Sequence, residues 1–282
     1  GGMEFLSNGD LAVCTWPGEV YIVEKPTGPA AEVKFRRFAR GLCEPLGVKI
    51  IKDEIFLVQK CELTKLVDTD GNGEADLYQT VCDDWGFNGN YHAFAIGPVT
   101  DKDGNFYVNI NGHRFHYDVP YCAWTVKISP DGKMDGFCSG IRSPNGLGVW
   151  GPDGDIFMSD NQGNYIGACK LNHLQQGKFY GHPSSTPAPA YDIKTAVVQP
   201  PAIWFPRKLA PSSSGIHEIK DPRFGPFDGQ MLVGDFQNGI VTRVALEKVG
   251  GEWQGAVFPF LKGFYSGVNR LAAGPDGKLY VG

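Results

Sequence analysis

The sequence predicts an all-β protein, a six-bladed β-propeller whose sixth blade is incomplete. Three observations lead to this prediction: a short phrase that recurs six times, a spacing between its copies that suits a four-stranded blade, and no helical pattern longer than a turn or two. We expect residues 1–282 to form a single domain that is a fragment of a longer chain.

The recurring phrase is a turn with Gly or a polar pair, followed by alternating apolar residues that end in a β-branched or aromatic strand. Its copies start at Asn8, Asp53, Asp103, Asp153, Asp228 and Asp276. They lie about 45 to 50 residues apart except for one longer interval, which indicates an insertion near residues 170–212. Asp-Gly pairs supply the positive φ angles of tight hairpins. Because one blade cannot bury both its faces, six should stack around an axial channel.

Composition excludes several classes of function. A net charge of -5 and a pI near 5.7 argue against a surface that tracks nucleic-acid phosphates. No stretch approaches the roughly 18 apolar residues that span a bilayer. The 7 cysteines contain no C-x-x-C pair, so they indicate neither a zinc site nor attached haem. We expect them to be small buried residues, with one disulfide at most.

One segment has the spacing of a calcium loop. Oxygen-bearing side chains stand at alternate positions, namely Asp68, Asp70, Asn72, Glu74 and Asp76. Gly73 stands at the sharp bend that such loops require, whereas Gln79 stands where a bidentate Glu is usual. We predict a structural calcium site here. The alternative is an acidic surface turn between strands.

A histidine and two arginines precede predicted first strands of blades, near the axial channel. A neutral imidazole at His92 can accept a proton from an alcohol while hydride leaves the same carbon; the alternative is a structural histidine. Arg142 and Arg270 occupy equivalent positions, where a guanidinium can bind a carboxylate or polarise a carbonyl. Alternatively, each pairs with an aspartate such as Asp160 or Asp235.

Three further residues are candidate metal ligands by residue type. His113, His116 and Tyr117 have no carboxylate partner at a metal-ligand spacing, so we predict that they are loop residues. The sequence also lacks a G-x-S-x-G elbow and a G-x-G-x-x-G turn, and so gives no support to triad hydrolases or nicotinamide enzymes.

Several segments together resemble one family. They are residues 2–13, 18–23, 158–164, 170–174, 177–183, 204–206, 210–215 and 269–277. They are similar to the soluble pyrroloquinoline quinone-dependent glucose/sorbosone (aldose sugar) dehydrogenase superfamily, and most closely to its sorbosone-dehydrogenase-like membrane-associated dehydrogenases. Three positions differ from that pattern, since Ser143 replaces an Asn, Tyr91 replaces an acidic residue, and residues 235–238 carry no lysine.

The resemblance implies an oxidoreductase that oxidises a sugar, or a related alcohol or aldehyde, with hydride transfer to pyrroloquinoline quinone. It places the catalytic base at His92 and an arginine facing the quinone carbonyl at Arg142. The other cofactor-binding residues that it implies are Asn145, Gln162, Trp204 and Arg270. It also implies calcium beside the quinone, held by oxygens around Gln162, Gly163 and Asn164.

Partners and location follow from the resemblance alone. It implies a small-molecule sugar substrate, a c-type haem as electron acceptor, and a periplasmic or extracellular location. Two alternatives remain open on the residues themselves. One is a calcium-dependent propeller hydrolase or lactonase, and the other is a non-catalytic propeller that binds carbohydrate or protein.

Overall fold

The chain folds into sheets of antiparallel strands. The structure is a computed structural model and describes residues 1–113, 119–185, 192 and 194–282. Within these residues, five sheets of four strands and one of two strands form, each built from strands consecutive in the chain. The helices that the described residues form are two short 3-10 segments, Ala30–Glu32 and Pro222–Phe227, so the predicted lack of long helices is confirmed.

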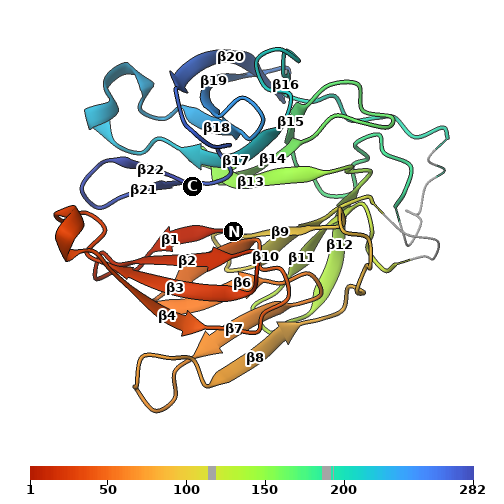
Figure 1. The fold of residues 1–282 in the computed structure, drawn as a ribbon. Coiled ribbons are helices and arrows are strands. Elements are labelled where there is room, and N and C mark those ends of the chain that lie inside the picture. Colours follow the sequence, from red (N-terminus) through yellow and green to blue (C-terminus); the bar gives the residue numbers. More distant parts are fainter. Residues whose placement is uncertain (114–118, 186–191, 193) are drawn as a thin grey trace.

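The first three sheets occupy the N-terminal half of the chain (Figure 1). The first contains β1 (Met3–Phe5), β2 (Leu11–Thr15), β3 (Glu19–Glu24) and β4 (Lys34–Ala39). The second contains β5 (Gly47–Ile51), β6 (Glu54–Val58), β7 (Leu63–Val67) and β8 (Leu77–Cys82). The third contains β9 (Ala95–Thr100), β10 (Phe106–Ile110), β11 (Trp124–Ile128) and β12 (Met134–Ser139).

The remaining sheets follow in the same order. The fourth contains β13 (Pro144–Trp150), β14 (Asp155–Asp160), β15 (Lys170–His173) and β16 (Ile203–Trp204). The fifth contains β17 (Ser213–Glu218), β18 (Met231–Asp235), β19 (Ile240–Val249) and β20 (Glu252–Lys262). The last contains β21 (Leu271–Ala273) and β22 (Leu279–Val281). The predicted insertion is the long connection from β15 to β16, of which residues 186–191 and 193 lie outside the description.

The first strands of the sheets form a closed ring. β1 lies beside β5, β5 beside β9, β9 beside β13, β13 beside β17, β17 beside β21, and β21 beside β1. Glycines allow this close approach of backbones. A Cβ at Gly47 would lie 1.5 Å from the carbonyl oxygen of Gly97, and one at Gly146 would lie 2.0 Å from that of Ser214. The N- and C-terminal ends of the described chain meet near the middle of the ring (Figure 1).

Each recurring phrase of the sequence forms the hairpin before a second strand. The second strands β2, β6, β10, β14, β18 and β22 all begin within or directly after one copy. Gly104 and Gly154 supply positive φ angles in two of these hairpins, at 82° and 73°. The second sheet has no glycine at this point and uses Lys52 and Asp53, with φ of 51° and 64°. Ser7 donates its backbone N–H and its hydroxyl to the Asp53 carboxylate and so supports that turn.

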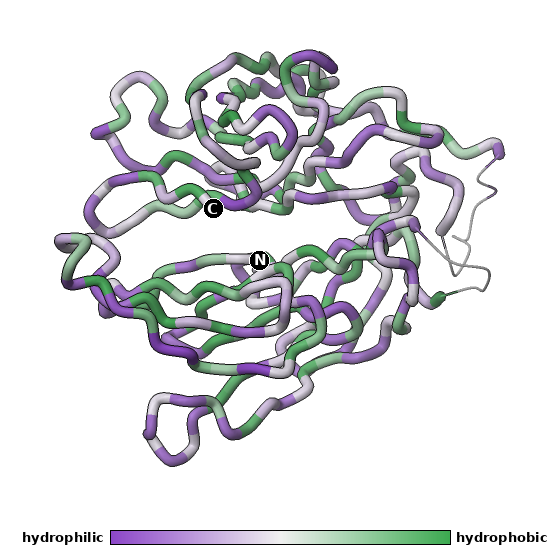
Figure 2. Tube along the Cα trace, viewed as in Figure 1, coloured by the Kyte–Doolittle hydropathy of each residue, from purple (hydrophilic) through white to green (hydrophobic). Residues whose placement is uncertain are grey.

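The core lies between neighbouring sheets. Hydrophobic residues are concentrated along the strands (Figure 2), and the second strands β10 and β18 are buried along their whole length. One cluster joins Phe56 and Val58 of the second sheet to Val108 and Val126 of the third. Similar clusters fill each of the other spaces between consecutive sheets. Each sheet therefore buries both faces only because it has neighbours.

The alternation of strand direction gives the ring two ends. The hairpins between first and second strands lie at one end, which we call the hairpin end. The turns between second and third strands, and the links from one sheet to the next, lie at the other, which we call the connecting end. The loop between β7 and β8 also lies at the hairpin end, toward the left of Figure 1.

The cysteines follow the expected burial only in part. All seven are free thiols in the structure, so the disulfide that the sequence left open does not form. The predicted burial holds for five of them, whereas Cys43 and Cys61 are partly exposed. A separate observation concerns membranes: none of the described residues belongs to a helix long and apolar enough to cross one.

Candidate functional site

Three connections bring His92, His113 and Arg142 together at the connecting end. His92 lies in the link from β8 to β9, His113 in the turn after β10, and Arg142 in the link before β13. The ring centroids of His92 and His113 are 5.8 Å apart. The backbone of His92 is held on both sides, because its N–H donates to Asn90 Oδ1 at 2.9 Å and its carbonyl accepts from Asn111 Nδ2 at 3.3 Å. Its side chain is exposed.

His113 is the residue that the sequence did not assign to the site. Burial, together with the charges of Arg142 and His92, lowers its pKa to about 4, so its ring is neutral at pH 7. Its carbonyl accepts from Asn88 Nδ2 at 2.6 Å, and the adjacent Gly112 N–H donates to the carbonyl of Arg142 at 2.7 Å. Its neighbours His116 and Tyr117 lie outside the described residues. The sequence feature that could have assigned His113 to the site is its position three residues after the second strand β10, in a turn at the same end as His92.

Arg142 is held by its backbone, and its guanidinium is only partly satisfied. The backbone N–H groups of Arg142 and Ser143 donate to the buried Asp160 carboxylate at 3.0 and 2.7 Å. The guanidinium Nη1 donates to the carbonyl oxygens of Gln162 at 2.6 Å and Asn161 at 3.4 Å. Its Nε is buried and has no hydrogen-bond partner in the described part of the chain. Asp160 therefore fixes the loop, whereas the suggested side-chain pairing of Arg142 with Asp160 does not form.

Gly163 permits this position of the guanidinium. Its φ is 154°, and a Cβ added there would lie 2.0 Å from the Arg142 guanidinium. The backbone N–H and C=O of Gly163 both bond to Ile166, at 2.7 and 3.1 Å. Burial lowers the pKa of Arg142, and the Asp160 carboxylate opposes that effect. Gly163 thus leaves room for a guanidinium, a group that stays charged at neutral pH.

Arg270 and Asn145 form a second polar group at the connecting end. Arg270 Nη1 donates to the backbone and side-chain oxygens of Asn145 at 2.8 and 3.0 Å and to the carbonyl of Asn269 at 2.8 Å. Its Nη2 donates to the carbonyl of Leu46 at 3.0 Å. Burial lowers the pKa of Arg270 to about 10, so it is charged at pH 7. Its contacts are neutral oxygens, and the suggested pairing with Asp235 does not form.

Among the described residues, neither arginine has a carboxylate at ion-pair distance. The arginines that form ion pairs in the described part of the chain are Arg36, Arg37 and Arg223. A cationic group held by neutral oxygens is costly to bury, and for Arg142 the nearby Asp160 carboxylate offsets this cost only in part. The two arginines and the orphaned Nε of Arg142 are donors that favour an anionic or carbonyl-bearing ligand.

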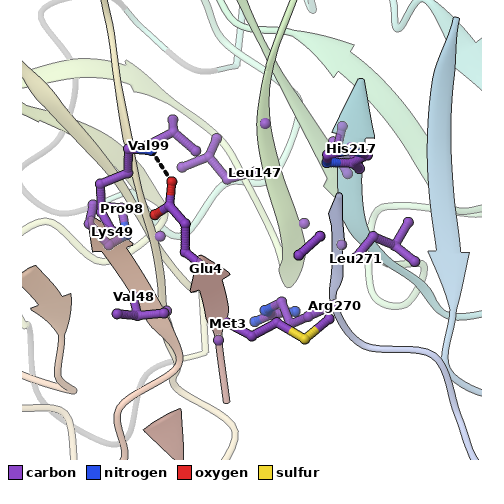
Figure 3. A pocket seen from close by; sticks show the side chains of 18 of the residues that line it. Met3, Glu4, Val48, Lys49, Pro98, Val99, Leu147, His217, Arg270 and Leu271 are labelled. Carbon is purple, nitrogen blue, oxygen red and sulfur yellow. Dashed lines mark hydrogen bonds and ion pairs between the residues drawn. The ribbon is translucent and has the colours of Figure 1, made fainter. Parts of the chain in front are cut away.

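An axial channel of about 530 Å³ runs along the ring. First strands of all six sheets line it, and Arg270 and Asn145 lie on its wall at the connecting end. Figure 3 shows the Glu4 carboxylate in an ion pair with Lys49 across the wall of this channel. His217 of β17 also faces it, and burial lowers the pKa of that imidazole. The channel is the expected axial space, but His92 and Arg142 are not among the residues that line it.

The remaining residues predicted for the cofactor are less closely gathered. Gln162 Oε1 accepts from Arg207 Nε, and Gln162 Nε2 donates to the carbonyl of Pro211, both at 3.1 Å. Asn164 is exposed. Trp204 belongs to β16, the outermost strand of its sheet, with 54% of its surface exposed and the Lys170 ammonium 5.7 Å from its ring. Three strand spacings, about 14 Å, separate its backbone from β13.

The acidic segment forms a self-contained loop between β7 and β8. The Asp68 carboxylate accepts from the backbone N–H groups of Gly71, Asn72 and Gly73 at 2.7, 3.2 and 2.8 Å. Arg36 donates to the carbonyl oxygen of Gly73. Within the described chain, no group of three or more His, Cys, Asp or Glu side chains is placed to hold a metal ion. The loop lies at the end opposite to His92 and Arg142.

Comparison with known proteins identifies the family. The family model described as glucose / sorbosone dehydrogenase matches residues 126–282, which is more than half of the chain. The chain belongs to the glucose/sorbosone dehydrogenase family. The matched segment of this dehydrogenase contains Arg142, Gln162 and Arg270, whereas His92 and His113 precede it. A search of curated proteins gave no match.

Solved structures share the fold of this family member at low sequence identity. An oxidoreductase described as a glucose dehydrogenase from Thermus thermophilus is 18% identical, with a TM-score of 0.73, and the match covers 99% of this chain and 89% of that one. The soluble aldose sugar dehydrogenase of Escherichia coli, in its apo form, is 17% identical, with a TM-score of 0.71 and coverages of 99% and 91%. The PQQ-bound aldose sugar dehydrogenase of Streptomyces coelicolor is 16% identical, with a TM-score of 0.69 and coverages of 99% and 86%.

Proposed function

We propose that this protein is a six-bladed propeller of one domain that oxidises a sugar, with hydride transfer to pyrroloquinoline quinone at the connecting end of the channel. The observation that carries the proposal is the pair of arginines there, Arg142 and Arg270, which bond to neutral oxygens and have no ion-pair partner in the described part of the chain. Family membership supports sugar oxidation, and a solved structure of similar fold is described as PQQ-bound. The hydrolase alternative needs converging carboxylates, and within the described residues no three or more His, Cys, Asp or Glu side chains are placed together for a metal ion.

The residues present fit an anionic quinone. The buried Nε of Arg142 is an unused donor, and Gly163 leaves the guanidinium space that any other residue would fill. Arg142 would bind a quinone oxygen, while Arg270 and Asn145 would hold the side of the cofactor nearest the channel. When bound, the quinone supplies an electrophilic carbon that accepts hydride. Trp204 and Gln162 stay proposals as further contacts.

The chain's own residues provide base and charge. His92 is exposed and accepts the proton of a sugar hydroxyl at a ring nitrogen. His113 stays neutral beside it because burial and Arg142 disfavour its protonation, so it adds no charge that would repel a protonated His92. The fixed guanidinium of Arg142 stabilises negative charge that develops on an oxygen bound there, without having to reorganise.

Calcium fits the two predicted places differently. At residues 162–164 the backbone oxygens of Gln162 and Gly163 already accept hydrogen bonds from Arg142 and Ile166. That arrangement makes Arg142 the positive charge at this position and does not fit a calcium ion, so we derive no step through one. The loop at residues 68–76 remains our proposed structural calcium site. A periplasmic or extracellular location and a c-type haem acceptor are proposals that rest on the family resemblance.

The test is a titration of the chain with pyrroloquinoline quinone in the presence of calcium, followed by dye reduction with a panel of aldoses. We expect Arg142→Ala to weaken quinone binding by roughly tenfold or more, because a charge-assisted hydrogen bond is lost. Arg37→Ala, which removes an arginine paired with Glu19 on an outer strand, should bind as the unaltered chain does. A folded chain that binds no quinone overturns the proposal.

A further inference from the structure

Exposed aromatic side chains gather at the connecting end. Besides Trp204, the exposed aromatic residues in the links and turns of the described chain are Trp16, Phe87, Tyr91, Tyr165, Phe236 and Tyr265. All lie at the connecting end. The other exposed aromatic residues, such as Phe35, lie on outermost strands. Large apolar side chains exposed together on one end of a molecule indicate a surface that binds a ligand or partner.

Two of these rings, together with the half-buried Phe94, flank the imidazole of His92. We call Trp16, Phe94 and Tyr91 the aromatic strip. The ring centroids of Trp16 and Phe94 are 5.2 Å apart, and the Phe94 ring is 6.2 Å from the imidazole of His92. Tyr91 lies on the other side of that imidazole, at 4.1 Å. Trp16 is 51% exposed and Tyr91 75% exposed, so both rings can be reached from solvent.

The backbone holds the strip in place. Trp16 stands in a tight turn between β2 and β3, in which Gly18 N–H donates to the carbonyl of Thr15 at 3.0 Å. Pro17 fixes φ in that turn, and Leu42 N–H donates to the carbonyl of Gly18 at 3.1 Å. Because the turn is already ordered, the protein loses little conformational entropy when a ligand stacks on Trp16.

We propose that the aromatic strip is a saccharide subsite, which stacks one ring of an oligosaccharide while the neighbouring sugar unit presents its hydroxyl to His92. A pyranose ring has C–H groups on its faces and hydroxyls around its edge, so it packs flat on an aromatic face and keeps its polar edge in water. The family's sugar chemistry favours this occupant over a protein partner. The orientation toward His92 rests on the proposed function, whereas the binding itself does not.

The binding test uses the full chain without quinone. Maltotriose, cellotriose and glucose are titrated separately, and heat release and tryptophan fluorescence are recorded. We expect a trisaccharide to bind more tightly than glucose, and Trp16→Ala to weaken that binding by about tenfold, the loss of one stacking contact. Trp16→Phe should retain most of it. Phe35→Ala, which removes a ring that is 70% exposed on β4, should change nothing.

A second readout separates this inference from the proposed function. In the quinone-loaded enzyme, Trp16→Ala should raise KM for the trisaccharide about tenfold and leave kcat and the KM for glucose nearly unchanged. A chain that binds trisaccharide through Trp16 but reduces no dye supports the subsite and contradicts the proposed function. If neither trisaccharide binds more tightly than glucose, or if Trp16→Ala binds it unchanged, the subsite is overturned, even when glucose is oxidised.

Discussion

Two regions of the molecule have residues suited to chemistry, and they are built in opposite ways. The acidic loop of residues 68–76 is one continuous segment whose polar groups mostly bond to each other. The group around Arg142 combines links from several sheets, and none of its members forms a motif alone. The first region has the clearer sequence pattern, yet the second has a buried donor, Arg142 Nε, that has no partner among the described residues. The reactive site that we propose is thus the one whose polar groups folding leaves incomplete, and not the one with the more regular local motif.

The largest expected effect is on catalysis at the connecting end. His92→Ala should lower kcat/KM for sugar oxidation by about 10² to 10⁴, the usual contribution of a general base. Because the His92 side chain is exposed, the thermal midpoint should stay within a degree or two. The measurement is steady-state dye reduction beside a melting curve. A variant that keeps full activity would remove His92 from the mechanism.

A substitution at Gly163 tests whether Arg142 depends on its surroundings. Gly163→Ala adds a Cβ at 2.0 Å from the guanidinium, which must then move. We expect quinone affinity to fall by roughly tenfold, similar to Arg142→Ala, and the two losses not to add in the double variant, since they act on one group. Additive losses would show that Gly163 acts on the cofactor independently. Gly167→Ala, where an added Cβ meets no atom, is the matched control.

The acidic loop should affect stability and not catalysis. Asp68→Ala removes the acceptor of three backbone N–H groups and should lower the free energy of unfolding by about 1 to 2 kcal/mol. Calcium should raise the thermal midpoint of the unaltered chain by a few degrees and that of Asp68→Ala by less. Equal calcium effects in both would contradict the predicted site. Dye reduction by the quinone-loaded variant should be unchanged, which would separate this loop from the connecting end.

The smallest expected effect concerns pH. His113 has a pKa of about 4 in the folded chain, below the ordinary histidine value of 6.5, so the unfolded chain binds more protons between these values. Its neutral ring therefore contributes stability above about pH 6.5 that is lost as the pH falls toward 4. His113→Gln should lose less thermal stability between pH 7.5 and 4.5 than the unaltered chain. His173 and His217, whose pKa values are also lowered, remain in both proteins. Identical pH dependence of the two thermal midpoints would contradict the lowered pKa of His113.

The sequence predicted the parts of the fold that depend on local chemistry. Turn residues marked all six hairpins and thus the second strands, because a tight turn needs particular residues. It also placed Arg142 and Arg270 before first strands. It did not predict that the Arg142 guanidinium would bond to backbone carbonyls while the Asp160 carboxylate accepts from backbone N–H groups. The sequence is equally compatible with a direct bond between the two side chains. His113 was missed because its meeting with His92 depends on how two connections approach each other.

The contacts of Arg270 have a consequence for the order of folding. Its guanidinium bonds to Leu46 and Asn145, residues that stand 224 and 125 positions away in the chain. Contacts of such long sequence separation form late, because the chain must first lose the entropy of closing very large loops. The polar group around Arg270 at the connecting end is therefore assembled only when the last strands have joined the first. A ligand bound there would stabilise the closed ring, because it binds only after the first and last strands have joined. Release of that ligand should therefore favour opening of the ring between these strands.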